Sequence, residues 1–456
     1  MGVDRTRLPE VGADPVFRFP EIVRHRLANG LDVRTIEHRT VPVVTMVVQI
    51  EGGSGADPAG REGLAAITAD MVDEGTGSLS AIDVSDALSR IGADYDLDVG
   101  PDVTTFSLTT LERWAGRGAG FLADLLIRPS LREGDFERVR RLRVDRLRQM
   151  KDVAPAVAER SFLRLVYGDH PYGHLAIGTD AALRALSVDE VTGFHGSRFV
   201  PTQATLVIAG DMTHEQMHQL ATETFGGWTG PATPAEWTRA SDLEPPDMPA
   251  GRLAIVPREG AAQSELRIGH LSVRRDTADY PALLVMNSVL GGQFVSRVNL
   301  KLREEKGYTY GARTGFDWRR GRAPFALHAS VHTASTADAV KDSLDELEGL
   351  RGARPVTPTE LELAKASLTR GYPRNFETGA HVARAVAQLA LYGLPDTYFQ
   401  EFVPKVNAVT GDEVTRVAAA VLKPDRLTTL VVGDHASVAE PLSRLLGAPL
   451  VLSPDV

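Results

Sequence analysis

The chain has 456 residues, of which 43% are apolar and 24% charged; these proportions are ordinary for a globular protein, and the length is too great for one compact core. A formal net charge of −10 argues against sequence-independent binding of nucleic acid, because neutralising phosphates requires a basic surface. The chain contains no cysteine, which excludes disulfides, thiolate metal sites and cysteine nucleophiles.

The N-terminal segment MGVDRTRLPEVGADPVFRFPE carries early acidic residues and prolines and has no apolar core of a signal peptide. No apolar run approaches the length of a membrane span. We therefore expect a soluble, cytoplasmic protein with no membrane partner, or a periplasmic or secreted one if a signal peptide has been removed.

Strands and helices alternate along the first half. Residues 26–54 read as a strand, a break and a second strand, and residues 67–75 as a helix ended by glycine. A helix over 83–92 and two strands across a Gly-Pro break over 93–112 follow. Two more helices are predicted over 114–129 and 133–152. The many arginines of the last helix alternate with acidic residues, which favours a solvated flank over a nucleic-acid surface.

A repeat divides the chain. RFVPTQATLVIAGDM (198–212) and VLKPDRLTTLVVGDH (421–435) each place a proline before a short apolar strand that ends in Gly-Asp. Gly210 and Gly433 are 433 − 210 = 223 positions apart, about half of the chain. Residues 251–272 also repeat the strand, break and strand of the first half, and residues 280–292 its helix.

Between the halves, residues 230–251 are rich in proline, alanine and acidic residues and have no apolar period, which is typical of a linker. We therefore predict two homologous domains, residues 1–229 and 252–456, joined by the linker 230–251. A Pro-rich linker permits a hinge between them.

The segment THEQMHQL (213–220) contains the zinc-protease pattern H-E-x-x-H. On a helix, His214 and His218 would share one face and Glu215 would polarise a water molecule. The glycine and third histidine of the metzincin continuation are missing, and Glu236, the nearest downstream carboxylate, lies in the linker. We interpret the segment as a solvated first helical turn with Thr213 as its N-cap.

Several ordered motifs together resemble one family. They are GGSGADPAGREGLAAITADMVDEGTGSLS (52–80), IGADYDLDVGPDVTTF (91–106), HPYGHLAIGT (170–179), the two Gly-Asp strands and LREEKGYTYG (302–311). This order is similar to that of the pitrilysin-type inverzincin metallopeptidases, which include the mitochondrial processing peptidase, insulin-degrading enzyme and the core proteins of a respiratory complex. The resemblance covers nearly the whole chain. It implies an α+β fold of two homologous domains, each an antiparallel sheet flanked by helices, which face each other across a cleft.

Active members of that family carry H-x-x-E-H on the helix after the first strands. The frame of this motif is present here as residues 63–71, but Ala66 and Asp70 replace the two histidine ligands and Ala69 replaces the general-base glutamate. The third ligand, a glutamate on the long downstream helix, would fall near Arg146, which cannot bind a cation. The resemblance therefore implies a degenerate motif and no metal on this chain.

The family's second set of functional residues is retained. LREEKGYTYG places Arg303 and Tyr310 seven positions apart, and in family members the equivalent Arg and Tyr reach the substrate at the zinc ion. A Tyr hydroxyl can donate a hydrogen bond to a developing oxyanion, and Arg can hold substrate carbonyls. The ordinary alternative is a helix end followed by a turn and an exposed strand aromatic.

This division implies a partner. Some bacterial members of the family consist of two chains, one with the zinc motif and one with only the Arg/Tyr pair. The present chain resembles the second kind, and we expect a heterodimer with a homologous zinc-motif chain, with Zn²⁺ on that partner and peptides as substrates. The glycine-rich segment 52–60 lacks the Walker ending and is expected to be a flexible cover of the cleft or interface.

Three alternatives remain. A core-protein-like scaffold would use neither Arg303 nor Tyr310. A self-sufficient protease would act through the histidines of 213–220. A homodimer would bind peptides without cutting them, because both copies lack the zinc motif.

Overall fold

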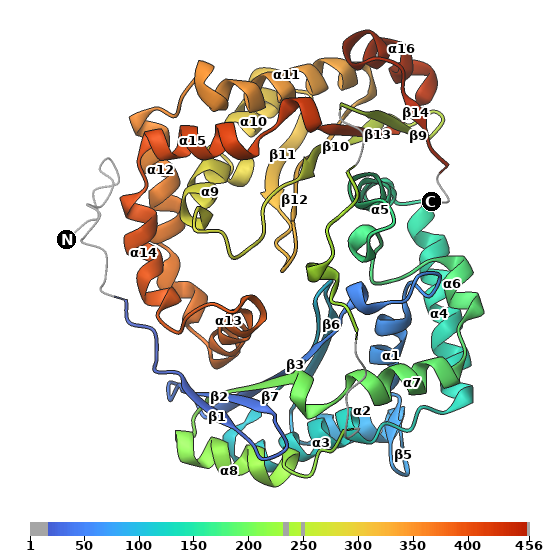
Figure 1. Ribbon diagram of the computed structural model, residues 1–456, viewed down its shortest axis with the longest axis vertical. Helices are drawn as coiled ribbons and strands as arrows, with labels where there is room; N and C mark the ends of the chain where they lie inside the picture. Colours follow the sequence, from blue (N-terminus) through green and yellow to red (C-terminus); the bar gives the residue numbers. More distant parts are fainter. Residues whose placement is uncertain (1–16, 231–236, 248–250, 454–456) are drawn as a thin grey trace, which may run out of the picture.

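The computed structural model describes residues 17–230, 237–247 and 251–453. It contains two six-stranded sheets, one built by each half of the chain, with helices on the outside of both (Figure 1). The predicted α+β class and the two similar halves are therefore confirmed. In the described residues, no helix combines the length and the apolar character that a bilayer crossing requires.

The N-terminal sheet has the strand order β1-β2-β8-β3-β7-β6. Its strands are β1 (Val23–Arg26), β2 (Asp32–Glu37), β3 (Val43–Glu51), β6 (Asp94–Val99), β7 (Val103–Leu111) and β8 (Ala204–Gly210). Neighbouring strands are antiparallel except β2 and β8, which run parallel. A two-stranded hairpin, β4 (Gly75–Thr76) and β5 (Leu79–Ser80), lies apart from this sheet.

The C-terminal sheet has the order β11-β12-β10-β13-β9-β14. Its strands are β9 (Leu253–Pro257), β10 (Gln263–Leu271), β11 (Thr309–Phe316), β12 (Pro324–His332), β13 (Thr428–Gly433) and β14 (Leu450–Val451). Here β9 runs parallel to β13 and β14. Each sheet thus departs from the predicted antiparallel pattern, because the last long strand of each half inserts parallel to an early strand, β8 beside β2 and β13 beside β9.

The two Gly-Asp repeats end the corresponding strands β8 and β13. A Cβ atom at Gly210 would lie 2.2 Å from the carbonyl oxygen of Val43, and one at Gly433 would lie 2.6 Å from the hydroxyl of Ser264. Both glycines allow the end of the strand to approach its neighbour closely, which gives this feature of the repeat a packing reason.

The helices of the first half include α1 (Leu64–Val72), α2 (Ala81–Arg90), α3 (Ala115–Ile127), α4 (Glu133–Lys151), α5 (Ala154–Tyr167), α6 (Asp180–Ala185), α7 (Val188–Arg198) and α8 (His214–Phe225). Those of the second half include α9 (Tyr280–Asn287), α10 (Arg297–Asn299), α11 (Thr336–Glu348), α12 (Pro358–Thr369), α13 (Gly379–Tyr392), α14 (Tyr398–Ala408), α15 (Gly411–Val421) and α16 (His435–Leu446). On the long helix α4, Phe136, Val139, Val144 and Leu147 are buried as the apolar pattern predicts, whereas Leu142 is exposed.

One helix from each half packs on the sheet of the other half. Helix α13 packs on β3 and β8, and α5 packs on β10 and β13 (Figure 1). Val386 of α13 is fully buried in the same apolar core as Val47 and Val207 of the N-terminal sheet. The two halves are therefore joined by interleaved packing as well as by the connecting segment.

The glycine-rich segment 52–60 was expected to be a flexible cover, and this expectation is wrong for most of it. The backbone amides of Ser54 and Gly55 donate hydrogen bonds to the carbonyl oxygens of Gly100 and Pro101, both at 2.9 Å. A Cβ atom at Gly53 would lie 1.9 Å from the Gly100 carbonyl oxygen. The glycines here permit close packing against the turn between β6 and β7. A glycine-rich sequence is equally compatible with close packing and with a flexible loop, so the sequence did not separate the two.

Candidate functional site

Helix α1 carries the positions of the degenerate zinc motif. The buried carboxylate of Asp57 accepts hydrogen bonds from the amides of Gly63 and Ala65, both at 2.7 Å, at the first turn of this helix. Burial raises the pKa of Asp57, and the nearby His174, whose Nε2 lies 3.0 Å from the carboxylate, opposes that rise. The start of α1 is therefore held firmly, and Ala66 is buried along it.

An internal ion pair occupies the place of the missing metal ligands. Asp70 accepts a hydrogen bond from the guanidinium of Arg143 on α4, and Arg143 also donates to the carbonyl oxygen of Ala176 at 3.0 Å. Arg146, which the sequence places near the third ligand, is exposed one helical turn further on. Arg143 is the α4 side chain that reaches Asp70.

The chemistry of these positions does not suit a zinc site. Ala66 and Ala69 have no ligand atoms, and the single carboxylate of Asp70 already pairs with a cation that would repel Zn²⁺. Over the described residues, no three His, Cys, Asp or Glu side chains converge in a way that could hold a metal ion.

The H-E-x-x-H segment opens α8, on the opposite side of the N-terminal sheet from α13 (Figure 1). Thr213 is its N-cap, as predicted, and forms a capping box with Gln216. His214 places its Nδ1 2.7 Å from the Thr35 hydroxyl, whereas His218 stacks on His25 of β1 with ring centroids 4.3 Å apart.

The two histidines of this segment therefore have separate partners within the fold. Burial lowers the pKa of His25, and the neighbouring His218 and His214 lower it further. Glu236, the remaining candidate ligand, lies outside the described residues. The segment has a structural role at the start of α8.

Arg303 and Tyr310 lie on the C-terminal half, near the open edge of its sheet. Arg303 is on a π-helical turn, Leu300–Glu305, and its guanidinium lies over the ring of Phe294 at 4.3 Å from the centroid. Tyr310 is on the edge strand β11 and is 88% exposed. Gly307, with φ of +65°, makes the turn between them.

Asn299 fixes the geometry around this pair, and the sequence reasoning missed it. Its side-chain amide donates to the carbonyl oxygen of Phe294 at 2.7 Å and accepts from the amide of Ala312 at 3.0 Å. It thus ties the loop that carries Phe294 to the strand that carries Tyr310. Asn299 is buried, and a side-chain amide can bridge two backbone segments, but neither its burial nor its partners are visible in the local sequence.

The structure does not bring the degenerate motif and the Arg/Tyr pair together. Figure 1 places α1 in the N-terminal half and β11 in the C-terminal half. The interactions found for Arg303 in the described residues are local ones, with Phe294 and, at 3.6 Å, with Glu304. The exposed side chain of Tyr310 is accessible to another molecule.

Fold and site residues together define a two-domain chain of metallopeptidase type that has no H-x-x-E-H motif. A model described as Insulinase (Peptidase family M16) matches residues 33–180, and one described as Peptidase M16 inactive domain matches residues 185–368. The chain belongs to the M16 peptidase family.

Relatives cover nearly the whole chain. An uncharacterized zinc protease of Mycobacterium leprae is 24% identical over 92% of this chain and 93% of its own length. A Helicobacter pylori protein named as a non-peptidase homolog is 21% identical over 90% of this chain and 94% of its own. The solved structure of a peptidase M16 inactive domain from Pseudomonas fluorescens has a TM-score of 0.84 at 21% identity, over 91% of this chain and 98% of that one.

Proposed function

We propose that this chain is the non-catalytic, substrate-contacting subunit of a heterodimeric zinc peptidase that acts on peptides or unfolded segments. One contrast carries the proposal. In the degenerate motif on α1, the carboxylate of Asp70 is already paired with Arg143. The Tyr310 side chain, by contrast, is exposed to solvent on the edge strand of the C-terminal sheet.

In this proposal Arg303 and Tyr310 complete a site whose metal lies on a homologous partner. Zn²⁺ on that chain would activate the attacking water. Tyr310 would donate a hydrogen bond to the oxyanion that develops on the attacked carbonyl, a contribution of about 3 kcal/mol per donor. Arg303, whose guanidinium lies over the ring of Phe294, would hold a neighbouring substrate carbonyl.

The substrate would bind in extended form. Strand β6 is at the edge of the N-terminal sheet, so one side of its backbone has no neighbouring strand in the described structure. An extended peptide can add to such an edge through main-chain hydrogen bonds. This mode needs no catalytic group beside the strand, and it suits a subunit that presents substrate to its partner.

A second candidate, a peptide-binding scaffold without a part in catalysis, is favoured by the name of the Helicobacter pylori relative. The two candidates differ in one respect. The scaffold tolerates loss of the Tyr310 hydroxyl, and the split site does not.

The proposal is tested by purifying this chain alone and together with a zinc-motif homologue encoded beside it in the genome. Bound zinc and hydrolysis of a broad fluorogenic peptide set are measured for each. We expect neither zinc nor turnover from this chain alone and both from the mixture. Stoichiometric zinc with turnover from this chain alone would contradict the proposal.

A further inference from the structure

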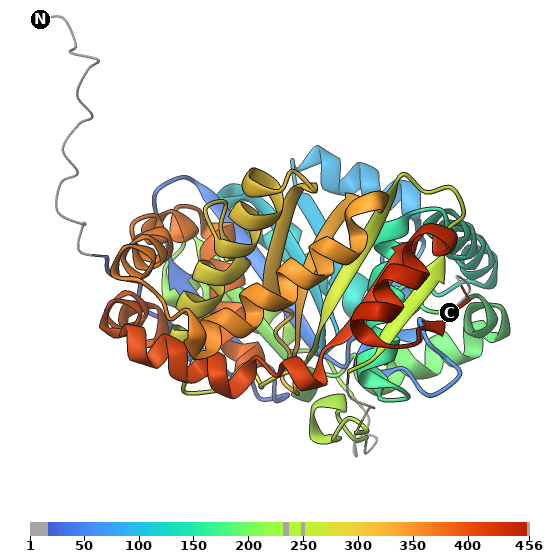
Figure 2. The same ribbon diagram turned by 90° about the horizontal axis from the view of Figure 1, so that it is seen from above.

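Residues 17–26 form a strap that contacts both halves of the molecule. The first residues of this strap lie beside the helices of the C-terminal half, and its last four are the edge strand β1 of the N-terminal sheet (Figures 1 and 2). The buried ring of Phe19 lies 4.7 Å from that of Phe399, measured between centroids. Arg24 of β1 pairs with Asp396 of the C-terminal half at 2.6 Å.

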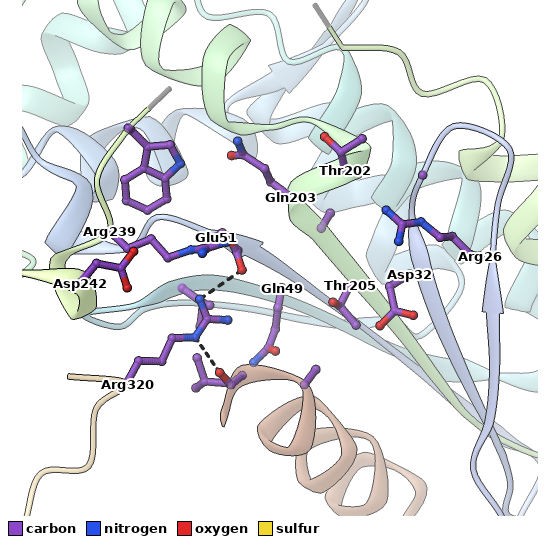
Figure 3. Close-up of a pocket in the computed structure, with 16 residues that line it drawn as sticks. Arg26, Asp32, Gln49, Glu51, Thr202, Gln203, Thr205, Arg239, Asp242 and Arg320 are labelled. Carbon is purple, nitrogen blue, oxygen red and sulfur yellow. Dashed lines mark hydrogen bonds and ion pairs between the residues drawn. The ribbon is translucent and has the colours of Figure 1, made fainter. Parts of the chain in front are cut away.

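The strap also lines a cavity between the two halves. This polar cavity has a volume of about 560 Å³, and Arg26 of β1 and Asp32 of β2, which are partners in the strand register, both line it. Figure 3 shows these two side chains together, on the side of the cavity away from Arg239 and Arg320. Because side chains alternate along a strand, His25 faces the other side of the sheet, toward α8. Detachment of β1 would therefore widen the cavity at this wall.

Two stacked histidines join β1 to helix α8. His25 lies against His218 with ring centroids 4.3 Å apart and an angle of 28° between the ring planes. The Nε2 atom of His25 and the Nδ1 atom of His218 are buried and have no hydrogen-bond partner in the described residues. A protonated imidazole carries N–H donors on both nitrogens and a charge, and both are costly to bury without a partner. The contact is therefore suited to neutral rings.

The neighbouring strand β2 supplies no charge that would compensate protonated rings. It turns Val33, which lies directly opposite His25, and Glu37 toward α8. The carboxylate of Glu37 accepts hydrogen bonds from the backbone amide of His214 at 3.0 Å and from Arg39 at 2.9 Å. This carboxylate is thus already engaged beside the start of α8.

Helix α8 adds no compensating charge in the described structure either. Its two acidic residues, Glu215 and Glu223, are exposed. Burial lowers the pKa of His25, and the charges of His218 and His214 lower it further. The group of three histidines therefore disfavours protonation at His25 on both grounds.

We propose that the stacked pair of His25 and His218 is an acid-sensitive switch that controls the attachment of the strap. Neutral rings hold β1 on the N-terminal sheet. Protonation places like charges in a half-buried contact, so β1 detaches and the cavity between the halves widens. The switch needs no zinc and no partner chain, and it stands apart from the proposed function.

The direction of the pH effect follows from comparing the attached and detached strap. On a detached strap the histidine has its ordinary pKa of about 6.5, whereas the pKa of His25 on the sheet is lower. The detached state therefore binds more protons, and detachment becomes more favourable as the pH falls below about 6.5. Above that pH the strap stays attached.

The test is hydrogen exchange of the full chain at pH 7.5 and pH 5.0, followed by mass spectrometry and corrected for the pH dependence of intrinsic exchange. Peptides that cover β1 should lose protection about tenfold at pH 5.0, the factor that one unit of pKa difference gives. Strand β13, in the C-terminal sheet, should keep its protection and serves as the internal reference.

Substitutions assign the effect to the histidines. His25→Phe keeps a ring in the stack but cannot be protonated, so its strap should be equally protected at both pH values. His218→Phe should reduce the loss, because one of the two like charges is gone. His332→Phe, at an exposed histidine of β12, is the matched control and should behave as wild type.

Circular dichroism at pH 7.5 checks the fold of each variant. Protection of the wild-type strap that does not change with pH would overturn the proposal. A loss at pH 5.0 in His25→Phe and His218→Phe equal to that of wild type would also overturn it.

Discussion

At the scale of single residues, the pairing of Asp70 with Arg143 stands where active members of the family bind a metal. The two side chains are only partly exposed, at 36% and 14%. The positive guanidinium of Arg143 partly neutralises the Asp70 carboxylate, as a bound cation would. This arrangement explains why α1 and α4 keep their packing although the ligands are absent.

Rebuilding the zinc site should therefore depend on Arg143. A chain with Ala66→His, Ala69→Glu and Asp70→His should bind no zinc while the guanidinium remains. With Arg143→Glu added, the chain should bind one zinc ion, because the new side chain places a carboxylate next to position 70. The measurement is zinc content by mass spectrometry after dialysis. Adding Arg146→Glu in place of Arg143→Glu is the matched control, and equal zinc in both quadruple variants would disprove this reading.

A neighbouring carboxyl group predicts a pH effect on stability. Burial, and to a smaller extent the charges of Glu74 and Asp70, raise the pKa of Asp73 to about 6. The folded chain therefore holds this proton more tightly than the unfolded chain, whose Asp pKa is about 3.9. For this group the free energy of unfolding is highest below about pH 4 and falls as the pH rises through about 6.

Asp73→Asn removes the free-energy cost of ionising this buried carboxyl group in the folded chain. It should raise the free energy of unfolding at pH 7.5 by about 1–2 kcal/mol, allowing for solvent screening, and change it little at pH 4. Urea unfolding at the two pH values measures the difference, with the exposed Asp94→Asn as control. An equal gain at both pH values would show that the charge of Asp73 is not its cause.

At the scale of elements, the open edge of β6 gives the sharpest test of substrate binding. The amide of Gly100 donates to the carbonyl oxygen of Val103 at 3.0 Å. Because hydrogen-bonding direction alternates along an antiparallel strand, Leu97 directs its N–H away from β7, toward the open edge.

Leu97→Pro should thus remove one edge donor without breaking the ladder to β7. In the proposed complex of this chain with a zinc-motif partner, we expect KM to rise about tenfold with a smaller change in kcat. Leu97→Ala controls for the lost side chain and should have little effect on KM. A KM for the proline variant equal to that of the alanine variant would exclude strand addition at this edge.

The sequence predicted the elements better than their contacts. Strands and helices fall close to the predicted ranges, because apolar periodicity and glycine breaks are local signals. The pairing of Arg143 with Asp70 and the clamp by Asn299 join segments far apart in the chain or depend on side-chain direction, so no local pattern reveals them. The packing of residues 52–60 was missed because glycine serves both tight contacts and loose loops.

At the scale of the whole molecule, the exchange of α5 and α13 makes the two halves interdependent. Val386→Asp would place a charge in the core that α13 shares with the N-terminal sheet, and it should lower the stability of both halves together. Thermal unfolding followed by segment-resolved hydrogen exchange should show one transition for wild type and variant. Separate transitions for the two sheets would contradict this coupling.

The same interleaving gives the chain a stable frame on which Arg303 and Tyr310 face outward. In the proposed function, these two residues act in the zinc site of a second chain. The central claim is therefore that the Tyr310 hydroxyl acts in the partner's zinc site.

The most direct measurement is kcat of the mixture of this chain and its zinc-motif partner with Tyr310→Phe. Tyr308→Phe, a change of the same size two residues away, is the control. The split-site account predicts a fall in kcat of about a hundredfold or more for Tyr310→Phe, as expected for loss of one oxyanion donor, with zinc content and complex formation unchanged. A kcat equal to that of the Tyr308→Phe enzyme would contradict the account and leave this chain as a scaffold.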